Sequence, residues 1–441
     1  MLAVKLLMEP CAWPTRESER ASERELVMRF VSVAFVLSIA AAAPVVAQTT
    51  PNADDGLSNQ TGLFHEPRVM SSSVTMANRW LGDSAGEPRD GFYADFGNMI
   101  TGAGWISAGP GYRRHLFGRR AFVDASAALS WRAYKMAQAR FELPGLARDR
   151  LTVGSQVRWQ DLTQVNYFGI GSASSDAARS QYRLKDTDVV GYGVYQANRW
   201  LAIGGTFGWL RRPTLSSPTG PFQGNWPDTA QAFPLDPGVA SQPSFLHGTA
   251  GVTVDTRDYP GHPTRGGLYR AGFAVYSDRD GGAFSFRRYD TEGLQMVPVK
   301  GDTWVLALHG WAGFSDTSSS AAVPFYMLPS LGGQDTLRGY TDYRFHDRNF
   351  LQASAESRWA LFRSIDAVLF FDAGNVAPRV GDLNMNKTSW GTGLRVHAKR
   401  STLARLDVGH STEGWRVFFK LDDPFGLKRL SRRTADAPFV P

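Results

Sequence analysis

Apolar side chains occupy every second position in many short segments of this chain from Gly91 onward. In residues 151–160, for example, Leu151, Val153 and Trp159 alternate with small or polar residues. Successive side chains of a β-strand point to opposite faces of the sheet, so the pattern predicts strands with one apolar and one polar face. Clusters of Gly, Pro, Asp and Asn between the segments predict turns. The chain is therefore expected to be all-β.

About fifteen segments carry this pattern, and bacterial single-chain barrels have even strand numbers, so one further strand is expected before Phe245 and about 16 in all. The long intervals 213–244 and 315–343 predict large loops. The expected strands are 92–97, 105–116, 121–131, 151–160, 181–196, 201–211, 246–255, 268–277, 284–299, 304–314, 351–359, 365–376, 389–398, 403–410 and 415–421.

The two faces of these strands favour a membrane barrel over a soluble sandwich, the alternative for such a sheet. The apolar faces carry aromatic residues near strand ends, as in the interfacial girdles of membrane barrels; these residues are Trp131, Trp159, Trp200, Trp209 and Trp390. The mean hydropathy of −0.27 excludes a bundle of membrane-spanning helices. Unpaired backbone groups in lipid cost several kcal/mol each, so the expected fold is a closed, transmembrane, antiparallel β-barrel.

The N-terminal region predicts export. An apolar run at 30–43 is followed by Val45 and Ala47, which fit a secretory cleavage site; an uncleaved anchor is the alternative. Cleavage there would remove Cys11, the single cysteine. The expected organisation is an upstream extension from a mis-assigned start (1–27), a signal peptide (28–47), a turn-rich periplasmic leader with a short helix near 74–81 (48–91), the outer-membrane barrel (92–425) and a basic tail (426–441).

Two motif groups stand out in the C-terminal half, the first in 329–374 and the second in 255–267. Their notable positions are Gly332, Gly333, Leu337, Arg338, Gly339, Tyr340, Glu356, Arg358, Phe371 and Asp372 in the first, and Asp255, Arg257, Arg265 and Gly266 in the second. In these positions the chain resembles the bacterial surface antigen family, the BamA/TamA-type barrels of the outer-membrane protein assembly superfamily.

The resemblance implies a 16-stranded barrel whose long loop folds into the lumen, where Arg338 contacts carboxylates of the inner wall. Strand parity agrees, because Glu356 is opposite in phase to Ala355 and Asp372 can point inward too. Guanidinium–carboxylate pairs are directional and charge-assisted. Arg338, with Gly339 and Tyr340 at the loop tip, is therefore predicted to latch the loop; the alternative is that Arg338 is only a solvated loop residue.

The ends of the chain depart from the family pattern. The last strand, with Trp415, Phe419 and a closing Phe425, resembles the family's terminal strand, but sixteen residues follow Phe425. The 44 residues from Gln48 to Gly91 are too few for the periplasmic POTRA domains that such proteins carry. The sequence therefore predicts a barrel-only member, with any capture of substrate left to a separate periplasmic protein.

The function implied by the resemblance is insertion or translocation of proteins across the outer membrane of a Gram-negative-type bacterium. A seam between the first and last strands would admit the cargo, either unfolded barrel proteins or a passenger. The expected partners are thus outer-membrane lipid and these polypeptides. The alternative is a passive pore, or a structural or anchoring barrel without assembly activity.

Other functional classes find little support in the sequence. No histidine pair has helical metal-ligand spacing, and neither a nucleophile elbow nor a P-loop is present, so no enzyme activity, cofactor or metal is predicted. Asp342, His346 and Asp347 would be the candidates for an outer-membrane hydrolase, a weak alternative. The basic residues of the tail are interpreted as a solvated segment or a contact for anionic lipid, with no nucleic-acid partner.

Overall fold

The computed structural model describes residues 62–81, 90–96, 104, 106–259, 261–398 and 401–421. All of them lie in one compact unit. The predicted upstream extension, signal peptide, basic tail and Phe425 fall outside these residues, as does most of the leader.

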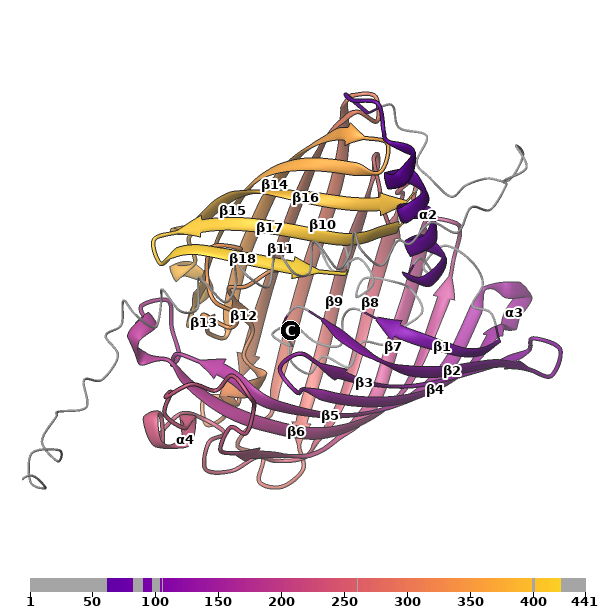
Figure 1. Cartoon of the computed structure of the whole chain (residues 1–441). Helices are drawn as coiled ribbons and strands as arrows, with labels where there is room; N and C mark the ends of the chain where they lie inside the picture. Colours follow the sequence, from indigo (N-terminus) through magenta and orange to yellow (C-terminus); the bar gives the residue numbers. More distant parts are fainter. Residues whose placement is uncertain are drawn as a thin grey trace, which may run out of the picture. The chain divides into compact units, whose positions relative to one another are not determined.

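A single antiparallel sheet of 16 strands dominates the described part of the chain, as predicted (Figure 1). Its strands are β1 (Gly91–Phe96), β2 (Ser107–Leu116), β3 (Ala121–Ser130), β4 (Lys135–Gly145), β5 (Leu151–Tyr167), β6 (Ser180–Gln196), β7 (Leu201–Ser216), β8 (Phe245–Asp255), β9 (Gly266–Asp278), β10 (Phe286–Lys300), β11 (Trp304–Thr317), β14 (Asn349–Phe362), β15 (Ile365–Ala377), β16 (Lys387–Ala398), β17 (Ser401–Ser411) and β18 (Gly414–Lys420). A small hairpin of β12 (Ser330–Leu331) and β13 (Phe345–His346) lies in the loop between β11 and β14. The helical segments are α2 (Arg68–Leu81), α3 (Leu146–Asp149), α4 (Thr229–Ala232) and the 3-10 turns η1 (Asp176–Ala178), η2 (Phe325–Met327) and η3 (Val380–Asp382).

The strand count and the two-faced pattern are confirmed. The strand missing from the sequence prediction is β4, which does precede Phe245. In β5, Val153 and Val157 are exposed to 39 % and 43 %, whereas Gln160 is completely buried. Apolar side chains therefore face outward and polar ones face the interior, as required of a sheet with lipid on one side.

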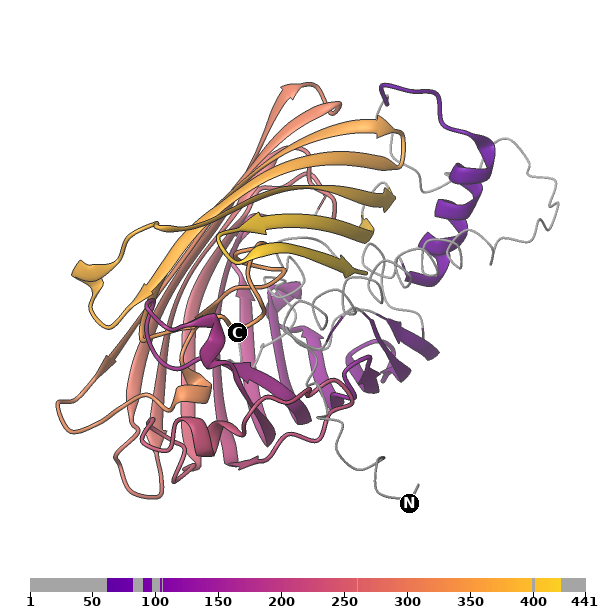
Figure 2. The same ribbon diagram turned by 60° about the vertical axis from the view of Figure 1, so that its left-hand side comes forward.

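Neighbouring strands of the sheet follow one another in the sequence from β1 to β18, except that the hairpin β12–β13 forms a separate sheet. Within the described residues no ladder joins β1 to β18, so these two strands form the edges of the sheet (Figures 1 and 2). The sequence predicted a closed barrel; the structure has a seam at the position where closure would occur.

Connections alternate between the two ends of the strands, and their lengths differ. Six of the seven turns at one end span five residues or fewer, as between β14 and β15, whereas the other end carries the loops 217–244 and 318–348. Short turns mark the periplasmic side of such barrels and long loops the outer side. The β8–β9 loop, residues 256–265, is the long connection at the short-turn end.

The main apolar core lies on the inner face, where the long loops cover the wall. Phe325, Tyr326 and Met327 from the 318–348 loop pack with Tyr167 of β5 and Tyr182 of β6. The rings of Tyr167 and Phe325 lie 4.7 Å apart. The interior is therefore packed with loop side chains in this region.

Helix α2 begins at Arg68, earlier than the helix predicted near 74–81. Hydroxyls in its first turns bond to preceding carbonyls, as Ser73 Oγ does to Val69 O at 2.8 Å. Val74 packs on Ala398 and Leu403, at the short-turn end of β16 and β17. In the described part of the chain, no helix has the length and apolarity needed to cross a membrane.

Candidate functional site: a buried ion-pair network beneath the long loop

The 318–348 loop folds back over the inner face of β14–β18 and places Arg338 against the wall. The Arg338 guanidinium donates to both oxygens of Asp372, from Nε at 3.0 Å and from Nη2 at 2.7 Å. Its Nη1 donates to Glu356, and its backbone N–H donates to Asp372 at 3.1 Å. Phe370 lies beneath the guanidinium, 3.6 Å from ring centroid to Cζ. All three charged groups are buried.

Strand geometry explains why the two carboxylates meet at one arginine. Glu356 of β14 and Asp372 of β15 both point to the inner face, and their strands are direct neighbours in the sheet. Paired strands lie about 4.8 Å apart, so side chains on the same face of both are within reach of one guanidinium. The arginine supplies the donors that two buried carboxylates need.

The network extends further than sequence reasoning found. Arg395 of β16 donates to Glu356 at 3.0 Å and to Asp407 of β17 at 2.5 Å. Arg358 donates to the other oxygen of Glu356 at 2.9 Å. The alternation of side chains along β16 and β17 could have identified Arg395 and Asp407, because each lies two residues from another buried side chain and so points to the same inner face.

A second branch of the network ties the loop to the end of the sheet. Arg405 of β17 bonds Asp407 at 3.1 Å and Asp335 of the loop at 2.7 Å. Lys420, the last residue of β18, reaches both oxygens of Asp335 at 3.1 Å. The loop is therefore ionically bound to four strands: Arg338 binds Glu356 of β14 and Asp372 of β15, and Asp335 binds Arg405 of β17 and Lys420 of β18.

The loop tip approaches β17 so closely that side chains are excluded there. A Cβ on Gly339 would lie 2.7 Å from the carbonyl group of His410. A Cβ on Gly409 would lie 2.2 Å from Arg338 O. Ser411 Oγ then donates to Gly339 O at 2.7 Å, which fixes the contact.

The remaining first-group residues shape the loop itself. Tyr340 is buried with Leu337 and Phe345, and its hydroxyl lies 3.3 Å from Thr412 Oγ1. Gly332 and Gly333 have positive φ values of 115° and 96°, a conformation that glycine adopts without steric cost. These residues give the hairpin β12–β13 its turn and place Arg338 at the wall.

Arg344 connects the same loop to both halves of the sheet. Its Nε donates to Glu413 of the β17–β18 turn at 2.8 Å, and its Nη1 and Nη2 donate to Ser174 of the β5–β6 loop at 2.9 and 2.7 Å. Burial raises the pKa of the Glu413 carboxyl, although Arg344 opposes this. Burial also lowers the pKa of the nearby His346 to about 3, with a contribution from the charge of Arg344.

The second motif group lies apart from the latch, on the β8–β9 loop at the short-turn end. Arg257 forms a two-point pair with Asp255, with both bonds at 2.9 Å. Arg265 is exposed and bonds Asp302 at 2.9 Å. Gly266 has φ 86°, and a Cβ there would lie 2.2 Å from Thr256 O. These contacts fold the loop and do not reach Arg338.

The terminal-strand residues occupy the β18 edge. Trp415 faces outward, is 54 % exposed, and contacts the ring of Trp390 edge-on and the ring of His410 at a tilt. Phe419 pairs with Leu406 of β17. Of the three residues considered for a hydrolase, His346 and Asp347 are buried within the loop and Asp342 is partly buried; His346 lies against the rings of Tyr167 and Tyr343.

Comparison with known proteins found one matching family model and solved structures with a similar fold. Residues 215–409 match the Omp85 superfamily domain. The fold is similar to BamA from Haemophilus ducreyi lacking POTRA domains 1–3, with a TM-score of 0.57 and 15 % identity over 76 % of this chain and 70 % of that chain. It is also similar to CdiB from Escherichia coli, with a TM-score of 0.52 and 14 % identity over 80 % and 69 %. No curated protein sequence matches the chain significantly.

Proposed function

Starting from an outer-membrane β-barrel of the BamA type with an Omp85 superfamily domain, we propose that this protein inserts or translocates polypeptides across the outer membrane. The cargo would be an unfolded barrel protein or an exported passenger. A separate periplasmic protein would deliver it. The family function implied by the sequence motifs and the geometry of the sheet edges both support this assignment.

The observation that carries the proposal is the pair of edge strands. β1 has 6 residues and β18 has 7, whereas β5 and β6 have 17 each. A strand edge presents a row of backbone N–H and C=O groups that can pair with an incoming chain. No ladder joins the two short edges in the described residues, so a cargo strand could pair with either edge without displacing the other.

The two edges are supported unequally. On one side, Lys420 of β18 and Arg405 of β17 hold the loop through Asp335. On the other side, β1 contacts the rest of the structure through β2 and through Tyr93, whose hydroxyl donates to Asp124 at 3.0 Å. We infer that β18 is the fixed template and β1 the strand that moves.

A disulfide across the seam tests the proposal. Ala94→Cys in β1 and Val417→Cys in β18 would be combined in a Cys11→Ser chain and joined by oxidation or by a short bifunctional maleimide. The matched control joins Val408→Cys to Val417→Cys, which lie opposite each other in the β17–β18 ladder. The readout is folding of a urea-denatured outer-membrane barrel added to proteoliposomes that contain the protein.

The expected result is loss of cargo folding with either seam cross-link, recovery on reduction of the disulfide, and full activity with the control cross-link. Full activity with a locked seam would contradict the seam mechanism. No cargo folding by the unmodified protein, together with a steady large conductance in planar bilayers, would favour the passive pore. A protein without either activity would be a structural or anchoring barrel.

A further inference from the structure

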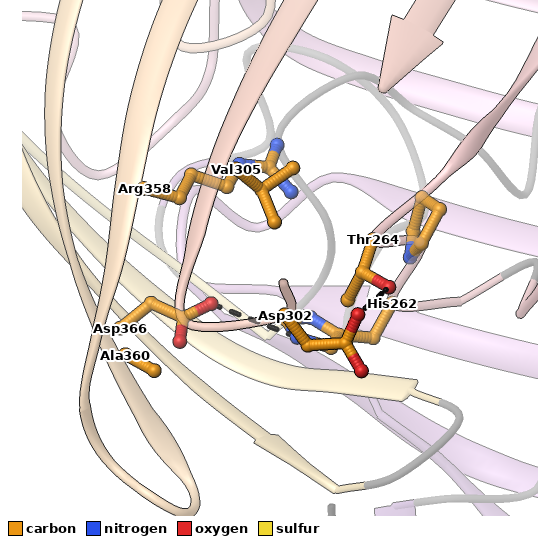
Figure 3. A pocket seen from close by; sticks show the side chains of 8 residues that line it. His262, Thr264, Asp302, Val305, Arg358, Ala360 and Asp366 are labelled. Atoms are coloured by element: carbon orange, nitrogen blue, oxygen red, sulfur yellow. Dashed lines mark hydrogen bonds and ion pairs between the residues drawn. The ribbon is translucent and has the colours of Figure 1, made fainter. Parts of the chain in front are cut away.

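The β8–β9 loop crosses from its own strands to the turn between β16 and β17. Gly261 forms a parallel bridge with Ser401, and the N–H of Thr402 donates to Gly261 O at 2.9 Å. This docking carries His262, the next residue of the loop, to the end of β15 and β16. Figure 3 shows His262 facing Asp366 there, with a dashed line between the two side chains.

Three metal-ligating side chains meet at this point: His262 of the loop, Asp366 of β15 and His397 of β16. Nε2 of His397 lies 3.2 Å from Asp366 Oδ1, and Nε2 of His262 lies 3.6 Å from Asp366 Oδ2. The two imidazole rings stack with their centroids 3.7 Å apart and their planes 9° apart. One ligand atom from each residue lies within 4.8 Å of those from the other two, and all three residues are at most 3 % exposed.

Each ring has an oxygen beside Nδ1 and the carboxylate of Asp366 beside Nε2. Nδ1 of His397 faces the carbonyl oxygen of Ala398 at 3.4 Å, and a carbonyl can only accept. Nδ1 of His262 lies 3.5 Å from Thr402 Oγ1, whose single proton goes to Gly261 O at 3.1 Å. A neutral ring that carries its proton on Nδ1 can donate to these oxygens and keeps the lone pair of Nε2 for a ligand beside the carboxylate.

A cation at its centre would suit this arrangement. Nε2 of His262 is buried without a hydrogen-bond partner in the described part of the chain, whereas Nε2 of His397 lies within hydrogen-bond distance of Asp366. Protonation of both stacked rings would bury two cations face to face, next to Arg358. A divalent ion would satisfy all three ligands and balance the carboxylate once one ring turns out of the stack, because two parallel rings cannot both direct their Nε2 lone pairs at one ion.

The donor set points to one class of ion. Two imidazoles and one carboxylate, with a fourth position left for water, is a ligand set that Zn²⁺ takes in proteins. Hydrogen bonds from metal-bound histidines to backbone or hydroxyl oxygens through the other ring nitrogen are the usual outer contacts of such sites. His262 and His397 lie far apart in sequence and on no helix, so a search for helical spacing cannot detect the pair.

We propose that His262, Asp366 and His397 bind one Zn²⁺ ion, which pins the β8–β9 loop to β15 and β16 at the short-turn end of the sheet. The ion would fasten together segments separated by more than a hundred residues. This site shares no ligand with the seam or with the Arg338 latch, although Arg358, which pairs with Glu356 of the latch, lies beside it.

Metal content and affinity test the site directly. The full chain, purified without a histidine tag and stripped with a chelator, is titrated with Zn²⁺ by calorimetry and with Co²⁺ by visible absorption. The variants are His262→Gln and His397→Gln. The matched control is His309→Gln, a buried histidine whose Nε2 lies 2.9 Å from one carboxylate, that of Glu292.

One Zn²⁺ per chain is expected, with tetrahedral Co²⁺ bands. Either ligand variant should bind at least about tenfold more weakly, while His309→Gln should bind as the unmodified chain does. Zn²⁺ should also slow trypsin cleavage after the exposed Arg265 of the unmodified chain but not of His262→Gln. No stoichiometric binding, or equal binding by all variants, would overturn the proposal. Heat-modified mobility on gels identifies any variant whose barrel has not formed, and Asp366→Asn then takes its place.

Discussion

The wall formed by β14–β18, the C-terminal wall, and the wall formed by β1–β4, the N-terminal wall, pair their inward charges in different ways. In the C-terminal wall the single carboxylate of Glu356 forms ion pairs with three guanidinium groups, those of Arg338, Arg358 and Arg395. In the N-terminal wall the carboxylate of Asp124 accepts hydrogen bonds from Arg113 and from the Tyr93 hydroxyl. The first arrangement is a continuous network that includes a loop, and the second is a local contact between neighbouring strands.

This difference teaches how a barrel can be both stable and able to open. A network in which each charge has several partners resists the loss of any strand, because separation would leave buried charges unpaired. In the N-terminal wall the charge pairs join only nearby strands, so these strands can move without breaking contacts to distant parts of the chain. The seam therefore has a rigid side and a compliant side.

The largest effect is expected from Arg338→Ala. Removal of this guanidinium leaves Glu356 and Asp372 with fewer donors in a buried site, which costs about 3–5 kcal/mol where water is excluded. The measurement is the urea midpoint of unfolding in detergent, with gel mobility after graded heating. An unchanged midpoint would show that the network does not stabilise the C-terminal wall. The midpoint of Arg338→Lys should lie between those of the unmodified chain and Arg338→Ala.

A smaller effect is expected where the loop tip meets β17. Gly339→Ala would place a Cβ 2.7 Å from the backbone of His410 and push the tip away, at about 1–3 kcal/mol. The control is Gly193→Ala in β6, where no atom lies within 4 Å of the new Cβ. Increased protease cleavage in the 318–348 loop of the first variant alone is the expected readout. Equal cleavage of both variants would mean that the tip contact does not hold the loop.

Acid should loosen the same loop at His346. The pKa of this histidine is about 3 in the fold and about 6.5 in an unfolded chain, so below pH 6.5 the unfolded form binds an extra proton. Stability is therefore lost as the pH falls, by about 1 kcal/mol between pH 6.5 and 5.5. His346→Gln should flatten this dependence of loop proteolysis on pH. If loop proteolysis of the variant depends on pH as strongly as that of the unmodified chain, the acid sensitivity arises from a group other than His346.

The smallest effect is expected in the N-terminal wall. Arg113→Ala removes one donor from Asp124, but Tyr93 still donates to that carboxylate. The expected loss is about 1 kcal/mol, that of one net hydrogen bond. The unfolding midpoints of Arg113→Ala and Arg338→Ala, measured side by side, test the contrast between the walls. Equal losses would contradict it.

Much of the fold follows from the alternation of side chains, but particular segments escape it. β4 was not identified because Leu143, Pro144 and Gly145 have the composition of a turn, although all three lie in the strand. The start of α2 was missed because a run of serines is typical of loops, and only the structure shows their hydroxyls bonded to helix carbonyls. The family resemblance placed a seam between the first and last strands, but the unpaired state of these two edges was not expected, because parity says which way side chains point and nothing about whether two edges pair.

The candidate site was predictable only in part, for a similar reason. Parity and family resemblance identified Arg338, Glu356 and Asp372 as inward or loop residues that could meet. Arg395, Arg405 and Asp407 join them through strand register and the path of the loop, which depend on contacts between distant segments. Whether the network acts as a latch remains a prediction, which Arg338→Ala tests.

The position of Arg344 has a mechanical consequence. One guanidinium grips Ser174 on one half of the sheet and Glu413 next to the last strand, so it acts as a clasp across the outer rim. Any widening of the seam that carries these halves apart must first break either the hydrogen bond of Arg344 to Glu413 or its two hydrogen bonds to Ser174. The two halves would then separate in one step rather than gradually, so a cargo chain arriving from the inner side would meet either a held or a released seam.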